Sequence, residues 1–204
     1  NKADKVFLII VFLLVLVGLF IFFSASLGLL VRNESLFSSV VSRQLIFGLL
    51  AGIVGLLIAS RIPHKYLKKY SFYFFIFSLF LTSLVFVDGI GFEHGGAKRW
   101  LDIFGISFQP AEFLKLSFVI YFAAILSSLK EKVKTFSYGL LPLLILLGIV
   151  GIILIKQPDT GTFMVIFITA IAMLIISGGR WAHVGILGAL SGMGLAVLAY
   201  IKPY

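Results

Sequence analysis

Two segments of this chain share a polar sequence pattern, and each lies directly before a long apolar run. Gln109-Pro110-Ala111-Glu112 and Gln157-Pro158-Asp159-Thr160 both set a glutamine and a proline ahead of an acid. Proline at the first helical position, with an acid in the first turn, is typical of a helix start. The N–H groups and dipole of such a start favour an anion such as phosphate. We therefore predict two helices whose amino ends form one anion-binding surface.

Basic side chains near these starts would complete a site for a diphosphate: Lys98, Arg99, Lys115 and Lys156. Other interpretations stay open. Glu112 and Asp159 also suit complementing the helix dipoles, holding the cations in ion pairs, or binding a divalent cation. Lys98 and Arg99 also suit contacts with lipid phosphates, and the spacing of Glu112 and Lys115 suits a pair on a helix surface.

The elements that position these residues are membrane-spanning helices. The chain has 204 residues, of which 61% are hydrophobic and only 12% charged, whereas about 25% are charged in soluble domains. The apolar runs are long enough to cross a bilayer and lack the alternation of barrel strands. We predict an all-α fold, a polytopic transmembrane helical bundle in a single membrane domain, with spans at approximately 6–23, 44–60, 71–87, 110–129, 138–155, 162–176 and 183–201.

The net charge of +9 predicts topology and not nucleic-acid binding, because the basic residues lie in short turns between spans. Residues 31–42 and 88–108 are interpreted as loops. Most basic residues fall on one side of the bundle: Lys2, Lys5, Arg61, Lys65, Lys68, Lys69, Lys130, Lys132, Lys134 and Arg180. The positive-inside rule makes that side cytoplasmic. The amino terminus is then inside, and the loop 88–108 and both Gln-Pro starts are outside.

Metal chemistry has little support in the sequence. There is no cysteine, and His94 and His183 have no partner at metal-ligand spacing. A divalent cation between Glu112 and Asp159 remains the one cofactor alternative.

At these residues the chain resembles the SEDS family (shape, elongation, division and sporulation), the FtsW/RodA type of bacterial cell-wall protein. The resemblance covers the chain in order and rests on four segments: Phe23-Ser24-Ala25-Ser26, Gly96-Ala97-Lys98-Arg99-Trp100, Phe108-Gln109-Pro110-Ala111-Glu112-Phe113-Leu114-Lys115-Leu116 and Gln157-Pro158-Asp159-Thr160-Gly161-Thr162. Arg43-Gln44-Leu45 and the Pro-Ala-Glu-Phe wording are closer to the division branch than to the elongation branch.

The resemblance implies a ten-helix protein of the bacterial cytoplasmic membrane that polymerises peptidoglycan glycan strands from lipid II. It implies a class B penicillin-binding protein and other divisome or elongasome proteins as partners. It also implies a substrate-binding set in which Lys98, Arg99 and Lys115 contact or steer the diphosphate, Glu112 orders Lys115, and Asp159 supports the cavity. Gln109 and Gln157 belong to the same set.

The resemblance places the family's proposed catalytic aspartate in a large outer loop after the seventh helix, beyond Tyr204. We therefore expect no catalytic residue within this chain. We expect the chain to stop short of that loop and to be inactive alone.

Two alternatives to the polymerase stay open, a lipid II flippase and a scaffold that recruits and activates the penicillin-binding protein. Transport predicts a polar path through the bundle. The spans 44–60, 71–87 and 138–155 carry no charge in their middles, which favours chemistry at the membrane surface.

Overall fold

The computed structural model describes residues 5–32, 34–87, 89–94, 97–103 and 106–201. The chain forms two compact units, Asn1–Ile62 and Pro63–Tyr204. Each unit has its own packing, and each is described by itself.

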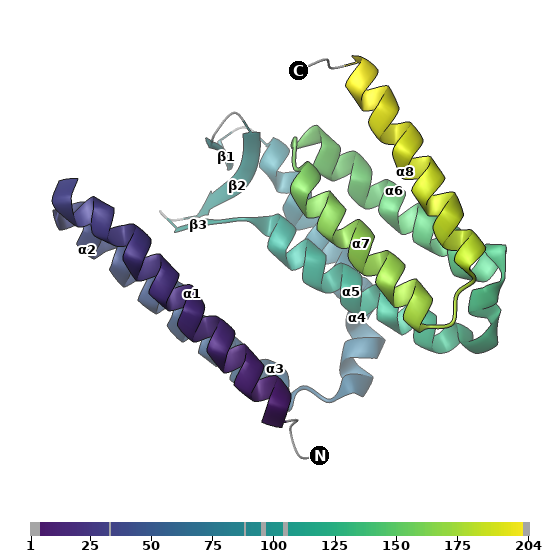
Figure 1. Ribbon diagram of the computed structural model, residues 1–204, viewed down its shortest axis with the longest axis horizontal. Coiled ribbons are helices and arrows are strands. Elements are labelled where there is room, and N and C mark those ends of the chain that lie inside the picture. The colour runs from purple at the N-terminus through teal and green to yellow at the C-terminus, as the bar shows by residue number, and fades with distance from the viewer. Residues whose placement is uncertain (1–4, 33, 88, 95–96, 104–105, 202–204) are drawn as a thin grey trace. The chain divides into compact units, whose positions relative to one another are not determined.

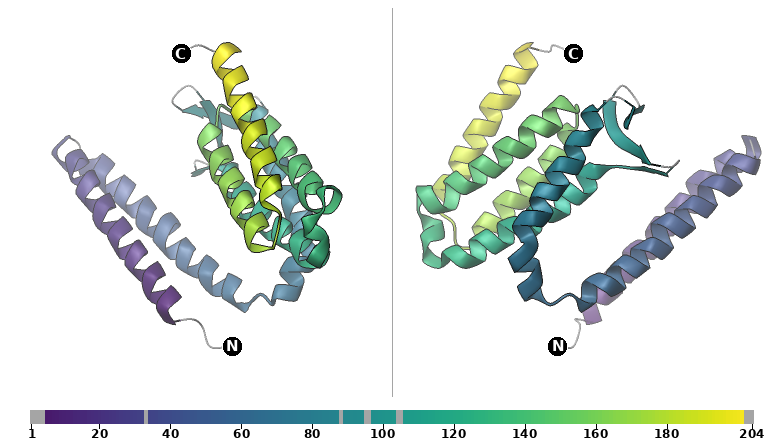
Figure 2. Two further views of the ribbon diagram at one scale, coloured as in Figure 1. Left: turned by 45° about the vertical axis from the view of Figure 1, so that its right-hand side comes forward. Right: turned by 180° about the vertical axis from the view of Figure 1, so that it is seen from behind.

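The first unit is a helical hairpin. Helix α1 (Lys5–Arg32) is followed by α2 (Glu34–Arg43), the π-helix η1 (Gln44–Leu50) and α3 (Ala51–Arg61). The last three form one continuous helical segment, which runs beside α1 (Figure 2). None of the residues of α2, η1 or α3 is buried. The hairpin therefore exposes its apolar side chains, as helices that face lipid do.

The loop predicted at residues 31–42 is wrong, because most of that segment is helix α2. Glycine and proline are absent from residues 29–47, so nothing breaks the helix. Glu34 lies in its first turn and Arg43 in its last, where each complements the helix dipole. The Ser39 hydroxyl donates to the carbonyl of Leu36 at 3.0 Å, so the serine bonds its own helix.

The second unit is a bundle that begins with α4 (His64–Ser83) and the 3-10 turn η2 (Leu84–Phe86). The sheet follows, and the remaining helical elements come after it: α5 (Pro110–Leu129), η3 (Lys130–Lys134), η4 (Phe136–Leu140), α6 (Leu141–Lys156), α7 (Thr160–Ile176) and α8 (Trp181–Ile201). Figure 1 shows α5, α6 and α7 side by side.

The core of this bundle lies between α5, α6 and α7. Its fully buried side chains include Phe118 and Phe122 from α5, Leu143 from α6 and Leu174 from α7. Helix α8 joins through Leu187. These apolar contacts hold α5 and α7 together along their length.

Helix α4 packs along α5 with a face that mixes small polar and aromatic residues: Ser71, Phe75, Ser78 and Thr82. The spacing of four, three and four residues is the period of one helix face. The Ser78 hydroxyl donates to Phe74 O at 2.9 Å, and the Thr82 hydroxyl donates to Ser78 O at 2.7 Å. Small residues whose hydroxyls are satisfied within the helix allow two helices to approach closely in a membrane.

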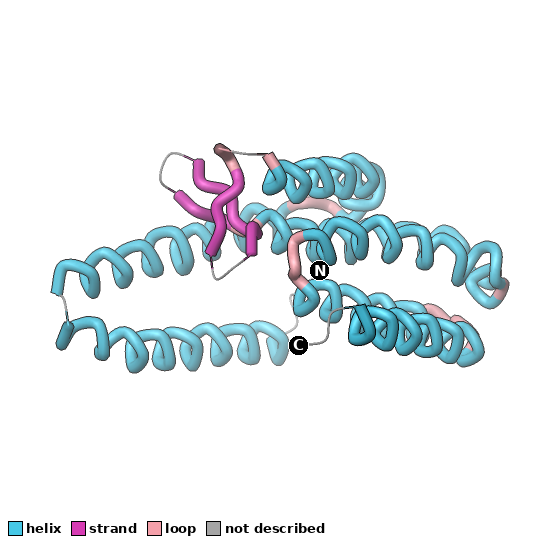
Figure 3. The backbone as a smooth tube through the Cα atoms, turned by 90° about the horizontal axis from the view of Figure 1, so that it is seen from above, coloured by secondary structure: helices cyan, strands magenta, loops and turns pink. Residues whose placement is uncertain are grey.

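The segment predicted as a polar loop at residues 88–108 contains a three-stranded antiparallel sheet, which is a correction. Its strands are β1 (Gly91–His94), β2 (Ala97–Ile103) and β3 (Ile106–Phe108), in the order β1-β2-β3 (Figure 3). Phe92 lies opposite Trp100 and Leu101 lies opposite Phe108. A β-bulge at Arg99 interrupts the central strand, because the register shifts opposite Phe92 and Glu93.

Among the described residues, five helical segments are long and apolar enough to cross a membrane: Lys5–Gly28, Glu34–Arg61, His64–Phe86, Pro110–Lys134 and Phe136–Lys156. Thr160–Ile176 and Trp181–Leu190 are shorter apolar helices. Each of the seven predicted spans overlaps one of these helical segments, and the boundaries of the membrane spans stay a prediction. The predicted helical membrane class is confirmed, with the small sheet as its exception.

Candidate functional site

The two Gln-Pro segments lie next to each other. Gln109 is the N-cap residue of α5, with Pro110 at the first position and Glu112 in the first turn. Asp159 is the N-cap residue of α7. The Gln109 side-chain amide donates from Nε2 to Asp159 Oδ2 at 3.1 Å. The two helix starts are therefore adjacent, as the repeated Gln-Pro pattern predicts.

The Asp159 carboxylate bridges both helix starts. Oδ2 accepts from Gln109, while Oδ1 accepts from the backbone N–H of Thr162 at 3.3 Å. The side chain is buried, with 4% of the residue exposed. A carboxylate is favourable there because helix amino ends carry partial positive charge.

This geometry corrects the predicted start of the second helix. Pro158 is not its first residue and Asp159 is not within its first turn. Proline precedes the helix, and the acid caps it. The Asp159 carboxylate lies at the amino end of α7, where it accepts from the Thr162 N–H and where the helix dipole favours an anion.

The turn between α6 and α7 is closed by backbone bonds and by an arginine from the sheet. Asp159 N donates to Leu154 O at 2.9 Å. Arg99 on β2 donates from Nε to Gln157 O at 3.4 Å, and from Nη2 to Pro158 O. These carbonyls follow the carboxyl end of α6, where a cation complements the dipole.

Gln157 is the most enclosed polar residue of the site, with 1% exposed. Its Nε2 donates to the carbonyl of Thr82 at 2.7 Å. That carbonyl belongs to the last turn of α4, where helices leave carbonyls without an internal partner. Within the part of the chain that the structure describes, Gln157 Oε1 has no hydrogen-bond partner. Gln157 thus connects the α6–α7 turn to α4.

Lys98 and Arg99 are consecutive residues of β2 with different surroundings. Lys98 is exposed and lies opposite Glu93 of β1. Arg99 stands at a β-bulge, because Lys98 pairs with Glu93 and Trp100 pairs with Phe92, which leaves Arg99 between the two pairs. Arg99 is half-buried and reaches the α6–α7 turn.

Glu112 and Lys115 form the predicted pair on the surface of α5. Lys115 Nζ lies 2.8 Å from Glu112 Oε1, and their side chains are 29% and 58% exposed for Lys115 and Glu112 respectively. Such an exposed pair contributes only about 0–1 kcal/mol to stability. Its groups are accessible, whereas those of Gln157 and Asp159 are not.

Six of the seven predicted residues fall into three groups. Gln109 and Asp159 bridge the helix starts, Arg99 and Gln157 tie the sheet and α4 to the turn, and Glu112 and Lys115 are accessible. The seventh, Lys98, is exposed on β2 opposite Glu93. Thr82 and Thr162 were missed because they act through backbone atoms. The buried spacing of Ser71, Ser78 and Thr82 within an apolar helix was the available signal. Among the described residues, no three His, Cys, Asp or Glu side chains lie together as a metal site would need.

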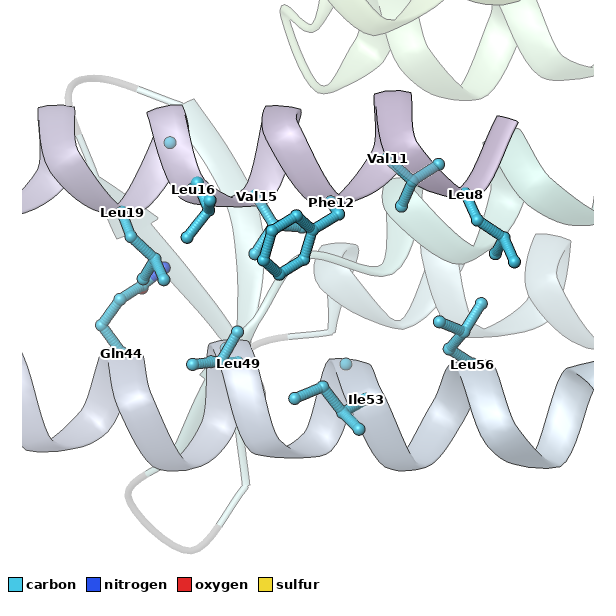
Figure 4. Close-up of a pocket in the computed structure, with 13 residues that line it drawn as sticks. Leu8, Val11, Phe12, Val15, Leu16, Leu19, Gln44, Leu49, Ile53 and Leu56 are labelled. Atoms are coloured by element: carbon cyan, nitrogen blue, oxygen red, sulfur yellow. The ribbon is translucent and has the colours of Figure 1, made fainter. Parts of the chain in front are cut away.

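A separate hollow lies within the first unit, between α1 and the η1–α3 segment. It is a groove of about 910 Å³. Figure 4 shows Phe12 and Leu16 on one side facing Leu49 and Ile53 on the other. Gln44 is the one polar side chain in its lining. Because the lining offers no charged group, the groove is not the candidate site.

Comparison with known proteins identifies relatives over nearly the whole chain. The sequence pattern of the FtsW/RodA/SpoVE family, described as "Cell cycle protein", matches residues 4–204. The chain is 33% identical to a probable peptidoglycan glycosyltransferase FtsW of Geobacter sulfurreducens, over 94% of this chain and 51% of the relative. It is 30% identical to stage V sporulation protein E of Bacillus subtilis, over 100% of this chain and 56% of the relative. It therefore spans about half the length of these relatives.

Solved structures give the same result. One neighbour comes from a peptidoglycan synthase complex described as coordinating polymerization and crosslinking, with TM-score 0.69, 27% identity and coverage of 88% of this chain and 51% of that one. Another is the rod shape determining protein RodA of Thermus thermophilus, with TM-score 0.56, 26% identity and coverage of 70% and 46%.

Proposed function

Because the chain belongs to the FtsW/RodA/SpoVE family of cell cycle proteins, we propose that it forms part of a peptidoglycan glycosyltransferase. The proposed enzyme polymerises glycan strands from lipid II at the outer face of the cytoplasmic membrane. The amino terminus is cytoplasmic in this proposal, and the sheet and the starts of α5 and α7 face outward. The relative named FtsW supports the division branch.

The observation that carries the proposal is the accessible Glu112–Lys115 pair in the first turns of α5. This pair lies beside the polar junction, the name used here for the contacts of Gln109, Gln157 and Asp159. Glycosyl transfer from lipid II releases a lipid diphosphate, so negative charge grows on the leaving oxygen. A cation placed there stabilises the transition state. Since the surface pair is weak, Lys115 can exchange Glu112 for the diphosphate and form charge-assisted hydrogen bonds.

Partners follow from the same family. The neighbour described as a synthase complex couples polymerization to crosslinking, which supports a class B penicillin-binding protein as the crosslinking partner. The scaffold alternative is compatible with this and needs no separate site. The flippase alternative gains no support from the sequence of the spans 44–60, 71–87 and 138–155, whose middles carry no charge.

The test uses the complete gene product with labelled lipid II in proteoliposomes. Lys115→Ala should reduce polymer formation by about 100-fold, as expected for loss of one preorganised stabilising group. Lys115→Arg should retain part of the activity. Lys134→Ala is the matched control, because Lys134 forms the same three-residue pair with Glu131 at the other end of α5.

Polymer formation that is equal in Lys115→Ala and in Lys134→Ala would contradict the assigned role of Lys115. Lipid scrambling without any polymer in the unmodified protein would instead favour the flippase.

A further inference from the structure

Arg99 of β2 meets the α6–α7 turn of the helical bundle. Its neighbour Lys98 is exposed, while Arg99 is half-buried and donates to two backbone carbonyls. We propose that Arg99 and Gln157 are positioning residues that dock the sheet and α4 on the α6–α7 turn, and that Arg99 binds these protein carbonyls instead of the lipid diphosphate.

The backbone polar groups of the α6–α7 turn need hydrogen-bond partners. Asp159 N already bonds Leu154 O, and Asp159 O accepts from Phe163 N at 3.3 Å. The carbonyls of Gln157 and Pro158 lie outside both helices' internal ladders. Gln157 is buried, so its carbonyl needs a partner, and Arg99 supplies N–H groups to it and to the carbonyl of the exposed Pro158. A guanidinium suits this because it presents several donors in a fixed plane.

Gln157 links the α6–α7 turn to α4. Gln157 uses its backbone carbonyl for Arg99 and its side-chain amide for Thr82 O. A single buried residue thus holds β2 on one side and the end of α4 on the other. The sheet itself begins shortly after α4, so Gln157 and Arg99 fix both ends of the connection between α4 and β2.

The position of the α6–α7 turn affects the candidate site. Asp159 follows Gln157 by two residues and bridges to Gln109 at the start of α5. Any displacement of the turn therefore moves the Asp159 carboxylate relative to α5, where Lys115 lies one turn further on. Arg99 and Gln157 act on the site through Asp159 and make no contact of their own with the reacting atoms.

Hydrogen exchange of the complete gene product without substrate tests this directly. Arg99→Ala should speed exchange by about tenfold or more in the β2 amides and in residues 157–163, since a charge-assisted bond is lost and the region opens locally. Arg99→Lys should fall between the two, because one ammonium cannot serve two carbonyls in a plane. Arg180→Ala, which removes an exposed arginine at the other end of α7, should leave this exchange unchanged.

Gln157→Met provides the second measurement, because it keeps the side-chain volume and removes the donor to Thr82. Exchange should rise in the last turn of α4 while the core of α5 stays protected. If Arg99→Ala leaves residues 157–163 as protected as in the parent protein but abolishes lipid II binding, Arg99 is a ligand and the docking role is overturned.

The activity measurement rests on the proposed function, and the exchange measurement does not. Arg99→Ala should lower kcat with a smaller change in KM, because a displaced site loses transition-state contacts more than binding. If the unmodified protein scrambles lipid II without forming polymer while exchange rises in Arg99→Ala, the proposed function fails and the docking role stands.

Discussion

The hairpin of the first unit and the junction of the second unit are built in opposite ways. In α2, η1 and α3 no residue is buried, and the groove beside α1 is lined almost entirely by hydrocarbon. At the junction, Gln157 and Asp159 are buried and their side chains bond residues far away in the sequence. The hairpin is held by its helical backbone, and the junction by specific side-chain contacts.

This difference predicts which substitutions should change the stability of the protein. An apolar side chain facing lipid has a lipid tail as an equivalent neighbour, so its shape is weakly constrained. A buried polar group has one partner at one distance, and losing that partner leaves the group unsatisfied. Paired substitutions in the two regions test this contrast.

Removal of a large aromatic side chain should give the largest difference. Phe118→Ala should lower the free energy of unfolding by about 3–5 kcal/mol, because it leaves a cavity in the core of the second unit. Phe20→Ala, at a side chain on α1 that is 75% exposed, should change it by within about 0.5 kcal/mol. Thermal unfolding of both variants in the same detergent measures the contrast. Equal losses would show that α1 is packed as tightly as the bundle.

Removal of the bridging carboxylate should come next. Asp159→Ala loses the cap of α7, worth about 1 kcal/mol, and leaves the Gln109 amide without its partner, at about 1–3 kcal/mol. We expect a total loss of about 2–4 kcal/mol in the same unfolding measurement. Asp159→Asn keeps the volume and one accepting oxygen for the Thr162 N–H, but its Nδ2 is a donor and cannot accept from Gln109 Nε2. The asparagine variant should therefore recover the cap and not the bridge. An alanine variant as stable as the parent protein would show that neither contact contributes to stability.

Added methyl groups should give a smaller difference. A Cβ built on Gly91 lies 2.0 Å from the carbonyl oxygen of Val85, whereas one on Gly52 of α3 meets nothing within 4 Å. Gly91→Ala should therefore cost about 1–3 kcal/mol by displacing β1. Gly52→Ala should be neutral or gain up to about 1 kcal/mol from helix propensity. A strong loss in Gly52→Ala would indicate that a further helix packs on that face.

The sequence predicted more about the helices than about the connections. The seven apolar runs predicted the helices, and Pro110 with Glu112 marked the start of α5 correctly. The polar composition of residues 31–42 and 88–108 favours loops, whereas the structure has a helix at Glu34–Arg43 and three strands between Gly91 and Phe108. Polar composition indicates exposure to polar surroundings and does not by itself distinguish a loop from a helix or a strand.

The composition of this chain by itself determined that it folds as membrane helices, because hydrophobic length and the cost of unpaired backbone in lipid leave few other choices. The local sequence pattern determined where α5 begins and that acidic residues lie at both helix starts. Only the tertiary structure decided that Asp159 bonds Gln109, 50 residues away, that Gln157 bonds Thr82, 75 residues away, and that Arg99 serves the turn while Lys98 does not. Those contacts depend on how helices and strands pack against one another, and side-chain packing over such separations leaves no periodic trace in the sequence.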